Sequence, residues 1–369
     1  MILVIRKVMI VFGTRPEAIK MCPLVNELKN RQKLEAILCV TGQHREMLDQ
    51  VLTAFEVKPD YDLSIMKNKQ TLFDVTISIL EKMKAILEEV NPDVVLVHGD
   101  TSTTFVTALA CYYLKIPIGH VEAGLRTYNI YSPFPEEFNR QAVDIVSSFN
   151  FAPTELSKNN LVNEGKDPNK IFVTGNTVID ALRTTVRKNY THKHLEWASD
   201  SRLIMITAHR RENLGEPMKN MFRAIRRILD ETDDVKAIYP IHLNPVVREA
   251  ANDIFGESDR IRIVEPLDVL DFHNFLAKSY LILTDSGGIQ EEAPSLGKPV
   301  LVMRDTTERP EGIAAGTLKL VGTDEECIYK AFKQLLENQN EYDKMSKASN
   351  PYGDGFASVR IADILEEKL

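Results

Sequence analysis

The sequence predicts an α/β protein made of two Rossmann-like, doubly wound domains that face each other across a central cleft. Short apolar runs rich in β-forming residues alternate with stretches of helix length throughout the 369 residues, which is typical of parallel sheets covered by helices. The length suits two domains of ordinary size. The series of strands also occurs twice, and a polar stretch at residues 183–201 separates the two series. We therefore place an N-terminal domain at residues 1–172 and a C-terminal domain at residues 173–354.

Strands are expected where apolar runs are short and bounded by turn residues. They are predicted at residues 8–12, 36–40, 94–97, 116–120, 171–173, 203–207, 237–239, 261–264, 281–284 and 299–302. A helix is predicted at residues 71–90, and its apolar stripe would consist of Phe73, Ile77, Leu80 and Leu87, with Lys84 as the polar exception. Because ligands of open α/β sheets bind at the carboxyl ends of the strands, the loops that follow these strands are the first candidates for a functional site.

Composition and charge exclude several classes of function. The net charge of −8 argues against non-specific nucleic-acid binding. No run of about 18 apolar residues occurs, so no membrane span is predicted. The apolar N-terminus is broken by Arg6 and Lys7 and lacks the cleavage site of a secretion signal. The four cysteines stand singly and are expected to be reduced thiols in the core. Together these features indicate a cytoplasmic protein without a metal site.

The motif GTRPEAIK, residues 13–20, directly follows the first predicted strand. A glycine ends the strand, and Pro16 suits the first turn of a helix. The free N–H groups of a helix N-terminus attract phosphate, and Arg15 and Lys20 add positive charge. The alternative is an ordinary strand–helix turn with solvated charges. A similar loop, TGQH, places His44 after the second strand, where a surface role is the simpler interpretation.

Carboxylates follow two further strands and begin a predicted helix. Asp100 lies in HGDTSTT and Glu122 in GHVEAGLRT, where Glu122 has unusually apolar neighbours for a solvated glutamate. Asp100 could equally be a helix cap. Glu136 and Glu137 open the helix of PFPEEFNR, where a favourable interaction with the helix dipole is the alternative to a function.

In the second half, cationic and imidazole groups follow the strands. TAHRREN carries His209, Arg210 and Arg211 directly after the first strand of the second series, and IHLNP repeats this pattern with His242. A basic surface triplet is the alternative interpretation.

The most specific motif is DSGGIQEEAPSLGKP, residues 285–299. Ser286, Gly287 and Gly288 follow a strand and open a helix, so that a diphosphate could approach backbone N–H groups. Glu291 or Glu292 is then placed to accept the ribose hydroxyls. The next strand is followed by TTERPEG, which contributes Arg309.

These motifs together resemble those of the non-hydrolysing UDP-N-acetylglucosamine 2-epimerases, cytoplasmic bacterial and archaeal enzymes of the GT-B fold. The resemblance extends over essentially the whole chain and also includes GNTVIDAL, HLNP and NPYGDG. It implies a UDP diphosphate site formed by Arg15, Lys20, Ser286, Gly287, Gly288 and Arg309. It further implies that Glu292 binds the ribose and that Phe272 lies at the uracil. The implied catalytic residues are Asp100, Glu122, Glu136 and His209. The family often has Gln five residues before this phenylalanine, where the chain has Leu267, so that uracil recognition is altered if the side chain makes the contact.

The implied reaction interconverts UDP-GlcNAc and UDP-ManNAc without metal or NAD, as a step in cell-envelope polysaccharide precursor synthesis. UDP is eliminated to give 2-acetamidoglucal and then added back with C2 protonated from the other face. The resemblance also implies a homodimer and a final helix at residues 355–369 that packs back on the N-terminal domain. Some members bind UDP-GlcNAc as an activator, and the residues implied for this are Gln43, His44, Gln70, Glu137, Arg210 and His242. The alternatives are a retaining glycosyltransferase, a hydrolysing epimerase and a non-catalytic UDP-sugar sensor.

Overall fold

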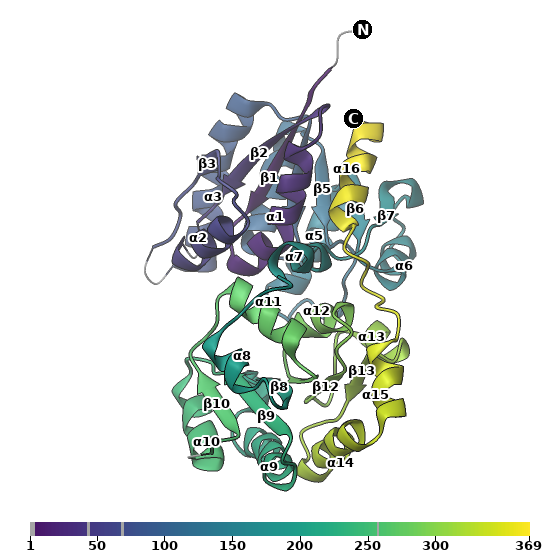
Figure 1. The fold of residues 1–369 in the computed structure, drawn as a ribbon. Coiled ribbons are helices and arrows are strands. Elements are labelled where there is room, and N and C mark those ends of the chain that lie inside the picture. Colours follow the sequence, from purple (N-terminus) through teal and green to yellow (C-terminus); the bar gives the residue numbers. More distant parts are fainter. Residues whose placement is uncertain (1–3, 43–44, 68–69, 257) are drawn as a thin grey trace. The chain divides into compact units, whose positions relative to one another are not determined.

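The computed structural model describes residues 4–42, 45–67, 70–256 and 258–369 (Figure 1). Internal contacts divide the chain into two compact units. Unit 1 comprises Met1–Thr184 and Tyr352–Leu369, and unit 2 comprises Thr185–Pro351. Each unit is an α/β domain with its own parallel sheet, as the alternating sequence pattern predicts.

The sheet of unit 1 has the strand order β3-β2-β1-β4-β5-β6-β7, and all of its paired strands are parallel. Its strands are β1 (Arg6–Phe12), β2 (Leu34–Val40), β3 (Tyr61–Asp62), β4 (Val94–His98), β5 (Ile118–Val121), β6 (Phe149–Ala152) and β7 (Ile171–Val173). The helices that connect and cover them are α1 (Arg15–Lys29), α2 (Arg45–Ala54), α3 (Leu72–Val90), α4 (Ser102–Leu114), α5 (Glu136–Val146), α6 (Glu155–Asn163), the short η1 (Pro168–Lys170), α7 (Thr177–Thr185) and α16 (Ala357–Lys368).

The sheet of unit 2 has the order β10-β9-β8-β11-β12-β13 and is also parallel. Its strands are β8 (Arg202–Thr207), β9 (Val235–Pro240), β10 (Ile261–Val264), β11 (Leu281–Thr284), β12 (Val300–Val302) and β13 (Leu318–Leu320). Its helices are α8 (Lys193–Trp197), the short η2 (Arg211–Asn213), α9 (Glu216–Glu231), α10 (Pro245–Phe255), α11 (Val269–Lys278), α12 (Ile289–Ser295), α13 (Pro310–Ala314), α14 (Glu325–Glu337) and α15 (Gln339–Ser346).

Every strand predicted from the sequence is present, with ends that differ by at most two residues. Three further strands, β3, β6 and β13, were not predicted. β3 has two residues, and β6 and β13 each have a polar residue within a run of three or four. In runs this short or interrupted, the apolar pattern is too weak to predict a strand from the sequence, and the strand is identified only by its pairing with a neighbour.

The predicted apolar stripe of α3 is correct only in part. Leu87 is buried and Leu80 packs against the core, but Phe73 and Ile77 are exposed, as is Lys84. The other buried side chains of the helix are Val75, Ile79, Met83 and Val90. The helix begins where expected, because Thr71 caps it and forms a capping box with Asp74. Phe73 and Ile77 are apolar although they are exposed, so the periodicity of apolar residues alone did not identify the buried face.

The C-terminal helix α16 packs against α1, as the resemblance implies. Arg31, just beyond the end of α1, pairs with Asp363 on α16 at 2.6 Å. Asp180 on α7 accepts hydrogen bonds from the backbone N–H groups of Ala357 and Ser358 at 3.2 and 2.7 Å, at the start of α16. Residues 173–184, which the sequence analysis assigned to the C-terminal domain, therefore lie in unit 1, because α7 is tied to the returning helix.

Three of the four cysteines, Cys22, Cys39 and Cys111, are buried free thiols, and burial raises the pKa of each to about 12. The expectation of a core position is wrong for Cys327, which is exposed on α14. Among the described residues, no helix is both long enough and apolar enough to cross a membrane.

Candidate active site

The strand order reverses once in each sheet. In each unit, two of the sequence motifs follow the two strands between which the order reverses. In unit 1 the reversal lies between β1 and β4, which precede GTRPEAIK and HGDTSTT. In unit 2 it lies between β8 and β11, which precede TAHRREN and DSGG. The chain runs to opposite sides from two such adjacent strands, and the resulting opening at their carboxyl ends is where doubly wound sheets bind ligands.

The loops after β1 and β4 are held together by the buried carboxylate of Glu17. It accepts hydrogen bonds from Gly13 N (3.0 Å), Thr14 N (2.8 Å) and the hydroxyl of Thr101 (2.7 Å). Burial raises the pKa of Glu17, and these hydrogen bonds partly oppose the effect. Gly13 must be glycine, because a Cβ there would lie 2.0 Å from the Thr41 hydroxyl. The loop that precedes Arg15 and Lys20 is thereby fixed in place.

Glu122 is the centre of the charged cluster in unit 1. Its φ of +68° lies in the left-handed region, which is uncommon for a residue with a side chain and is found at functional sites. Its carboxylate forms an ion pair with Lys20 and accepts a hydrogen bond from Asn176 Nδ2 at 3.1 Å. Lys20, assigned from the resemblance to the diphosphate, thus contacts a carboxylate here.

His98, the last residue of β4, lies beside this cluster and was not among the candidates from the sequence. Its Nε2 is 3.7 Å from a carboxylate oxygen of Glu122. The side chain is buried, and neither ring nitrogen has a hydrogen-bond partner among the described residues. Burial lowers the pKa of His98 to about 3, although the Glu122 carboxylate acts in the opposite direction. His98 is therefore a neutral imidazole near neutral pH.

Two residues of α5 bind Asp100, and Asp100 is not a helix cap. The N-cap of α4 is Thr101, whose hydroxyl accepts from Thr104 N at 3.2 Å. The carboxylate of Asp100 pairs with Arg140, and its backbone oxygen accepts a hydrogen bond from Asn139 Nδ2 at 2.8 Å. Two residues of α5 thus hold Asp100 at the carboxyl end of β4.

The two glutamates at the start of α5 have different surroundings. Glu137 is fully buried, and its carboxylate accepts from Thr127 N (3.0 Å), Tyr128 N (2.9 Å) and Gln141 Nε2 (2.8 Å). Glu136 is half-buried and makes no hydrogen bond or ion pair with any residue that the structure describes. Because it precedes Arg140 by one helical turn, Glu136 lies on the face of α5 that holds Asp100.

In unit 2 the buried carboxylate of Asp285 joins the loops after β8 and β11. It accepts hydrogen bonds from the backbone N–H groups of His209 and Arg210, each at 2.9 Å, and from Asn213 Nδ2 at 3.2 Å. Asp285 begins the DSGG motif, so one side chain fixes the His209 loop next to the glycines. Asp285 belongs to a motif predicted to bind a diphosphate, but no role was predicted for its own side chain.

His209 and His242 form a stacked pair, with ring centroids 5.3 Å apart and planes 9° from parallel. The pKa of His209 is lowered by burial and, further, by His242 and Arg210, against the opposing effect of Asp285. The neutral imidazole is therefore favoured, and its side chain stays 41% exposed and accessible to a ligand. A neutral, accessible imidazole can accept or pass on a proton.

Cationic side chains gather at the glycines of DSGG. The Nη2 atoms of Arg210 and Arg309 would lie 3.5 and 3.9 Å from a Cβ placed on Gly287, so both guanidinium groups border this residue. Arg309 also pairs with the buried Glu291 at 2.5 Å. The following helix, α12, has only seven residues and contains Pro294. The charge of the arginines is therefore the main attraction for an anion at Ser286, Gly287 and Gly288.

The remaining UDP-site candidates also lie in unit 2. Glu291 is buried and forms an ion pair with Arg309. Glu292 is partly exposed, and its Oε2 lies 3.7 Å from His273 Nε2. Phe272 on α11 is half-buried and packs, as does Leu267, against the apolar cluster beneath the sheet. Glu292 is thus the more accessible of the two glutamates.

The residues implied for an activator are divided between the units. Gln43 and His44 lie outside the described residues. In unit 1, Gln70 Nε2 donates to Ile65 O at 2.6 Å, and Glu137 is fully occupied by its hydrogen bonds. In unit 2, Arg210 and His242 flank His209.

Metal-ligand geometry is absent from the described part of the chain, where no three His, Cys, Asp or Glu side chains lie close enough to hold an ion. The residues that sequence reasoning missed, His98, Asn176 and Asp285, all stand in the quoted motifs within a few residues of a strand end. Their position was a usable signal, but their contacts come from other strands and helices.

Comparison with known proteins identifies the family. The family model for UDP-N-acetylglucosamine 2-epimerase matches residues 26–366. The chain is similar to the UDP-N-acetylglucosamine 2-epimerase of Bacillus subtilis (strain 168), with 63% identity over 97% of this chain and 94% of that protein. It is similar to the structure of UDP-GlcNAc 2-epimerase from Neisseria meningitidis bound to UDP-GlcNAc, with a TM-score of 0.89 and 50% identity over 98% of this chain and 100% of that one. The S. aureus MnaA–UDP co-structure matches with a TM-score of 0.90 and 52% identity, over 98% of this chain and 96% of that one. The chain therefore belongs to the UDP-N-acetylglucosamine 2-epimerase family of isomerases and shares its GT-B fold.

Proposed function

We propose that the chain interconverts UDP-GlcNAc and UDP-ManNAc by eliminating UDP to 2-acetamidoglucal and adding it back, without metal or NAD. The product would serve cell-envelope polysaccharide synthesis in the cytoplasm. The observation that carries the proposal is the set of carboxylates at the strand ends of unit 1: Asp100, Glu122 and Glu136. Such a set supplies proton carriers, which a binding protein or a simple nucleotide site does not need.

The chemistry explains why both proton carriers and cations are required. The hydrogen at C2 of the sugar is not acidic, because C1 is an acetal carbon. Departure of UDP makes C1 electron-poor and thereby acidifies the C2 hydrogen. One group must remove that proton, another must return a proton to the opposite face, and positive charge must stabilise the leaving diphosphate.

We assign the proton transfers to unit 1. Glu122 is paired with Lys20 and Asn176, which favour its ionised form, and Asp100 is paired with Arg140. The carboxylate of Glu136 has no such partner among the described residues, so that it can contact a substrate without breaking an ion pair. The low exposure of this cluster strengthens its electrostatic interactions.

We assign UDP binding to residues of unit 2, together with Arg15 and Lys20, which the resemblance implies for the diphosphate. Arg210 and Arg309 border Gly287, where they can stabilise the leaving diphosphate, and Glu292 is placed for the ribose and Phe272 for the base. His209 is held by Asp285 and favours its neutral form, which suits it for proton transfer to or from the leaving group.

Solvent deuterium should enter at C2 during the reaction, because the original proton is lost when UDP leaves. UDP-GlcNAc incubated with the enzyme in D2O should give UDP-ManNAc fully deuterated at C2, measured by proton NMR and mass spectrometry. Product that retains the original hydrogen would contradict the elimination. Free ManNAc with UDP would instead indicate a hydrolysing epimerase, and turnover that requires an acceptor would indicate a glycosyltransferase.

Glu136→Gln and Glu137→Gln form a matched pair one residue apart. Glu136→Gln should lower kcat by about 100-fold, since a proton carrier is removed. The stability should change little, because the Glu136 carboxylate makes no hydrogen bond or ion pair with the described residues. Glu137→Gln should instead lower the free energy of unfolding by about 1–3 kcal/mol, because an amide donor would face buried N–H groups. Steady-state rates and thermal melts separate the two effects. The reverse pattern would place the catalytic glutamate at residue 137.

We propose that the chain forms a homodimer through an apolar face of unit 1. Helices α3, α4 and α5 pack side by side and expose large apolar side chains that a monomer would leave in water: Phe73, Ile77, Tyr112, Tyr113 and Ile145. Contiguous exposed apolar groups of this kind are typical of protein interfaces.

Phe73→Asp should convert the dimer to a monomer, because it would bury a charge in this interface at the most exposed of these apolar side chains. Size-exclusion chromatography with light scattering measures the mass directly. Leu156→Asp, an equally drastic change at an exposed position on α6, is the control and should leave the mass unchanged. A wild-type monomer, or a dimer that survives Phe73→Asp, would refute this interface.

We also propose that UDP-GlcNAc acts as an activator through Gln43, His44, Gln70, Glu137, Arg210 and His242. The support in unit 2 is the placement of Arg210 and His242 around His209. Because Glu137 is saturated by structural contacts, its contribution would be to shape the site rather than to bind the ligand.

An enzyme activated in this way should start slowly on pure UDP-ManNAc. A trace of UDP-GlcNAc should abolish the lag, since activation requires that the activator bind the active state more tightly. Full progress curves in the reverse direction provide the measurement. A linear start that added UDP-GlcNAc does not change would exclude the activator while leaving the epimerase assignment intact.

A further inference from the structure

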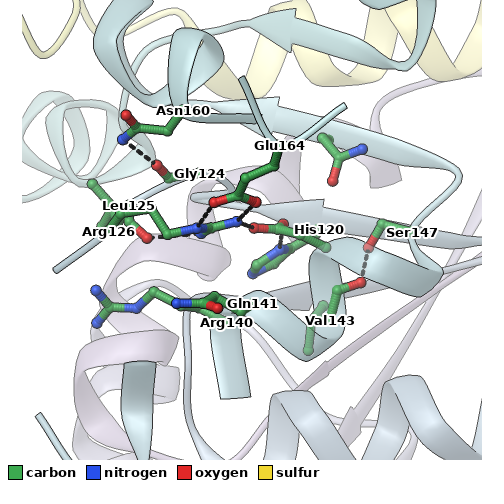
Figure 2. Close-up of polar contacts among 12 residues, drawn as sticks. His120, Gly124, Leu125, Arg126, Arg140, Gln141, Val143, Ser147, Asn160 and Glu164 are labelled. Atoms are coloured by element: carbon green, nitrogen blue, oxygen red, sulfur yellow. Dashed lines mark hydrogen bonds and ion pairs between the residues drawn. The ribbon is translucent and has the colours of Figure 1, made fainter. Parts of the chain in front are cut away.

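A chain of buried ionic groups lies beside β5 in unit 1 and has no part in the mechanism described so far (Figure 2). His120 Nδ1 is 2.5 Å from Asp144 Oδ1, and Asp144 Oδ2 is 2.7 Å from Arg126 Nη2. Arg126 also binds Glu164 through Nε and Nη2, at 2.6 and 2.8 Å. The side chains of His120, Asp144 and Arg126 are inaccessible to solvent. They therefore cannot rely on water to complete their hydrogen bonds or to screen their charges.

The hydrogen-bond partners of His120 determine its protonation state. Its Nε2 is 2.7 Å from the backbone oxygen of Gly99, which can only accept a hydrogen bond. Its Nδ1 faces Asp144, which is ionised: burial by itself raises the pKa of Asp144, but His120 and Arg126 more than offset this and hold the pKa below its usual value. Because both partners are acceptors, both ring nitrogens must carry a proton. The ring is an imidazolium, and two cations then balance two carboxylates.

The other ionisable groups near the ring are compatible with this charge. Asp144 faces it from α5, and Arg126 lies behind Asp144 in the loop that follows β5. From the neighbouring strand β4 comes His98, whose pKa of about 3 keeps it uncharged. Asn150, the partner of His120 on β6, is polar but does not titrate. The adjacent cation is thus one reason why His98 stays neutral.

The imidazolium is connected through the backbone of Gly99 to the turns that carry the two carboxylates Asp100 and Glu122. Gly99 donates its N–H to Val121 O at 2.9 Å and accepts from His120 at its own oxygen. Gly99 precedes Asp100, and Val121 precedes Glu122. A Cβ on Gly99 would lie 3.5 Å from the Glu122 carboxylate, so the two turns are in contact. The hydrogen bond from His120 therefore fixes both turns at once.

We propose that His120 is a positioning residue, held as an imidazolium by Asp144, that fixes Asp100 and Glu122 relative to each other for the epimerase reaction. The catalytic part of this inference rests on the proposed function. The protonation state of His120 does not.

The protonation state can be measured on the full-length protein labelled with 15N in its histidine rings. One histidine should show two protonated nitrogens at every pH from 6 to 9, and its signal should vanish in His120→Gln. If His120→Gln fails to fold, Asp144→Asn identifies the same signal, which should begin to titrate in this range. A neutral tautomer for this signal in the wild-type protein, or its titration between pH 6 and 9, would overturn the proposal.

The positioning role predicts an altered pH profile in Asp144→Asn. Without the carboxylate, Nδ1 of His120 no longer faces an anion. The ring can then lose a proton as pH rises, and a neutral ring can donate to only one of its two acceptors. The kcat of Asp144→Asn should therefore fall by about tenfold or more between pH 6 and pH 9 relative to wild type, with KM changed less than about twofold. UDP binding should be unchanged, because Asp144 contacts His120 and Arg126 and none of the residues proposed to bind UDP. His194→Gln, at a half-buried position on α8 of unit 2, is the control and should follow the wild-type profile.

The outcomes distinguish a failure of the positioning role of His120 from a failure of the proposed epimerase function. A kcat of Asp144→Asn that is lowered equally at every pH, or not at all, would overturn the positioning role. A wild-type enzyme without epimerase activity would overturn the proposed function and with it the catalytic role of His120, whereas the NMR experiment would still decide its charge.

Discussion

The direction of the strands is the constraint on which both units depend. Every strand pair in the two sheets is parallel, so the loops that leave the carboxyl ends in each unit share one edge. The strand order reverses at β1/β4 and at β8/β11, and the chain departs to opposite sides at these points. Loops that are distant in the sequence are thereby brought together without any long excursion of the chain. Four of the charged motifs, GTRPEAIK, HGDTSTT, TAHRREN and DSGG, follow these four strands.

Buried ionisable side chains are the second feature that organises unit 1, and the surroundings of each one determine whether it is charged. His98 and His120 lie on adjacent strands at the same sheet edge, with His98 paired to Val121 and His120 paired to Val97. His98 has no hydrogen-bond partner among the described residues and is neutral, whereas His120 lies between a carboxylate and a carbonyl oxygen. A buried ion pair is seldom the best source of stability, since hydrophobic replacements often do as well. Its value here is the fixed geometry that it gives to the two turns.

Unit 2 uses a single buried carboxylate for a similar purpose. Asp285 binds the backbone N–H groups of the His209 loop while belonging to the glycine loop itself. The interaction is stronger than a neutral hydrogen bond because the acceptor is charged and excluded from water. The arginines beside Gly287 are left in reach of an anion, although Arg309 is shared with Glu291. One buried carboxylate thus orients His209 and fixes Arg210 beside the glycine loop.

The sequence by itself determined the fold class, the strands with strong apolar runs and the motifs at their ends. These features are local, because a buried parallel strand and the turn after it are encoded in fewer than ten adjacent residues. The sequence also gave the carboxylates Asp100, Glu122 and Glu136 as candidates. Which face of α3 is buried, where the two units divide, and which groups contact one another were decided only by the tertiary structure. The exposed Phe73 and Ile77 look apolar enough for a core, and no local signal separates them from Val75 and Ile79. In the same way, the charge of His120 depends on Gly99 and Asp144, which lie 21 and 24 residues away and reach the ring only when β4, β5 and α5 have packed together.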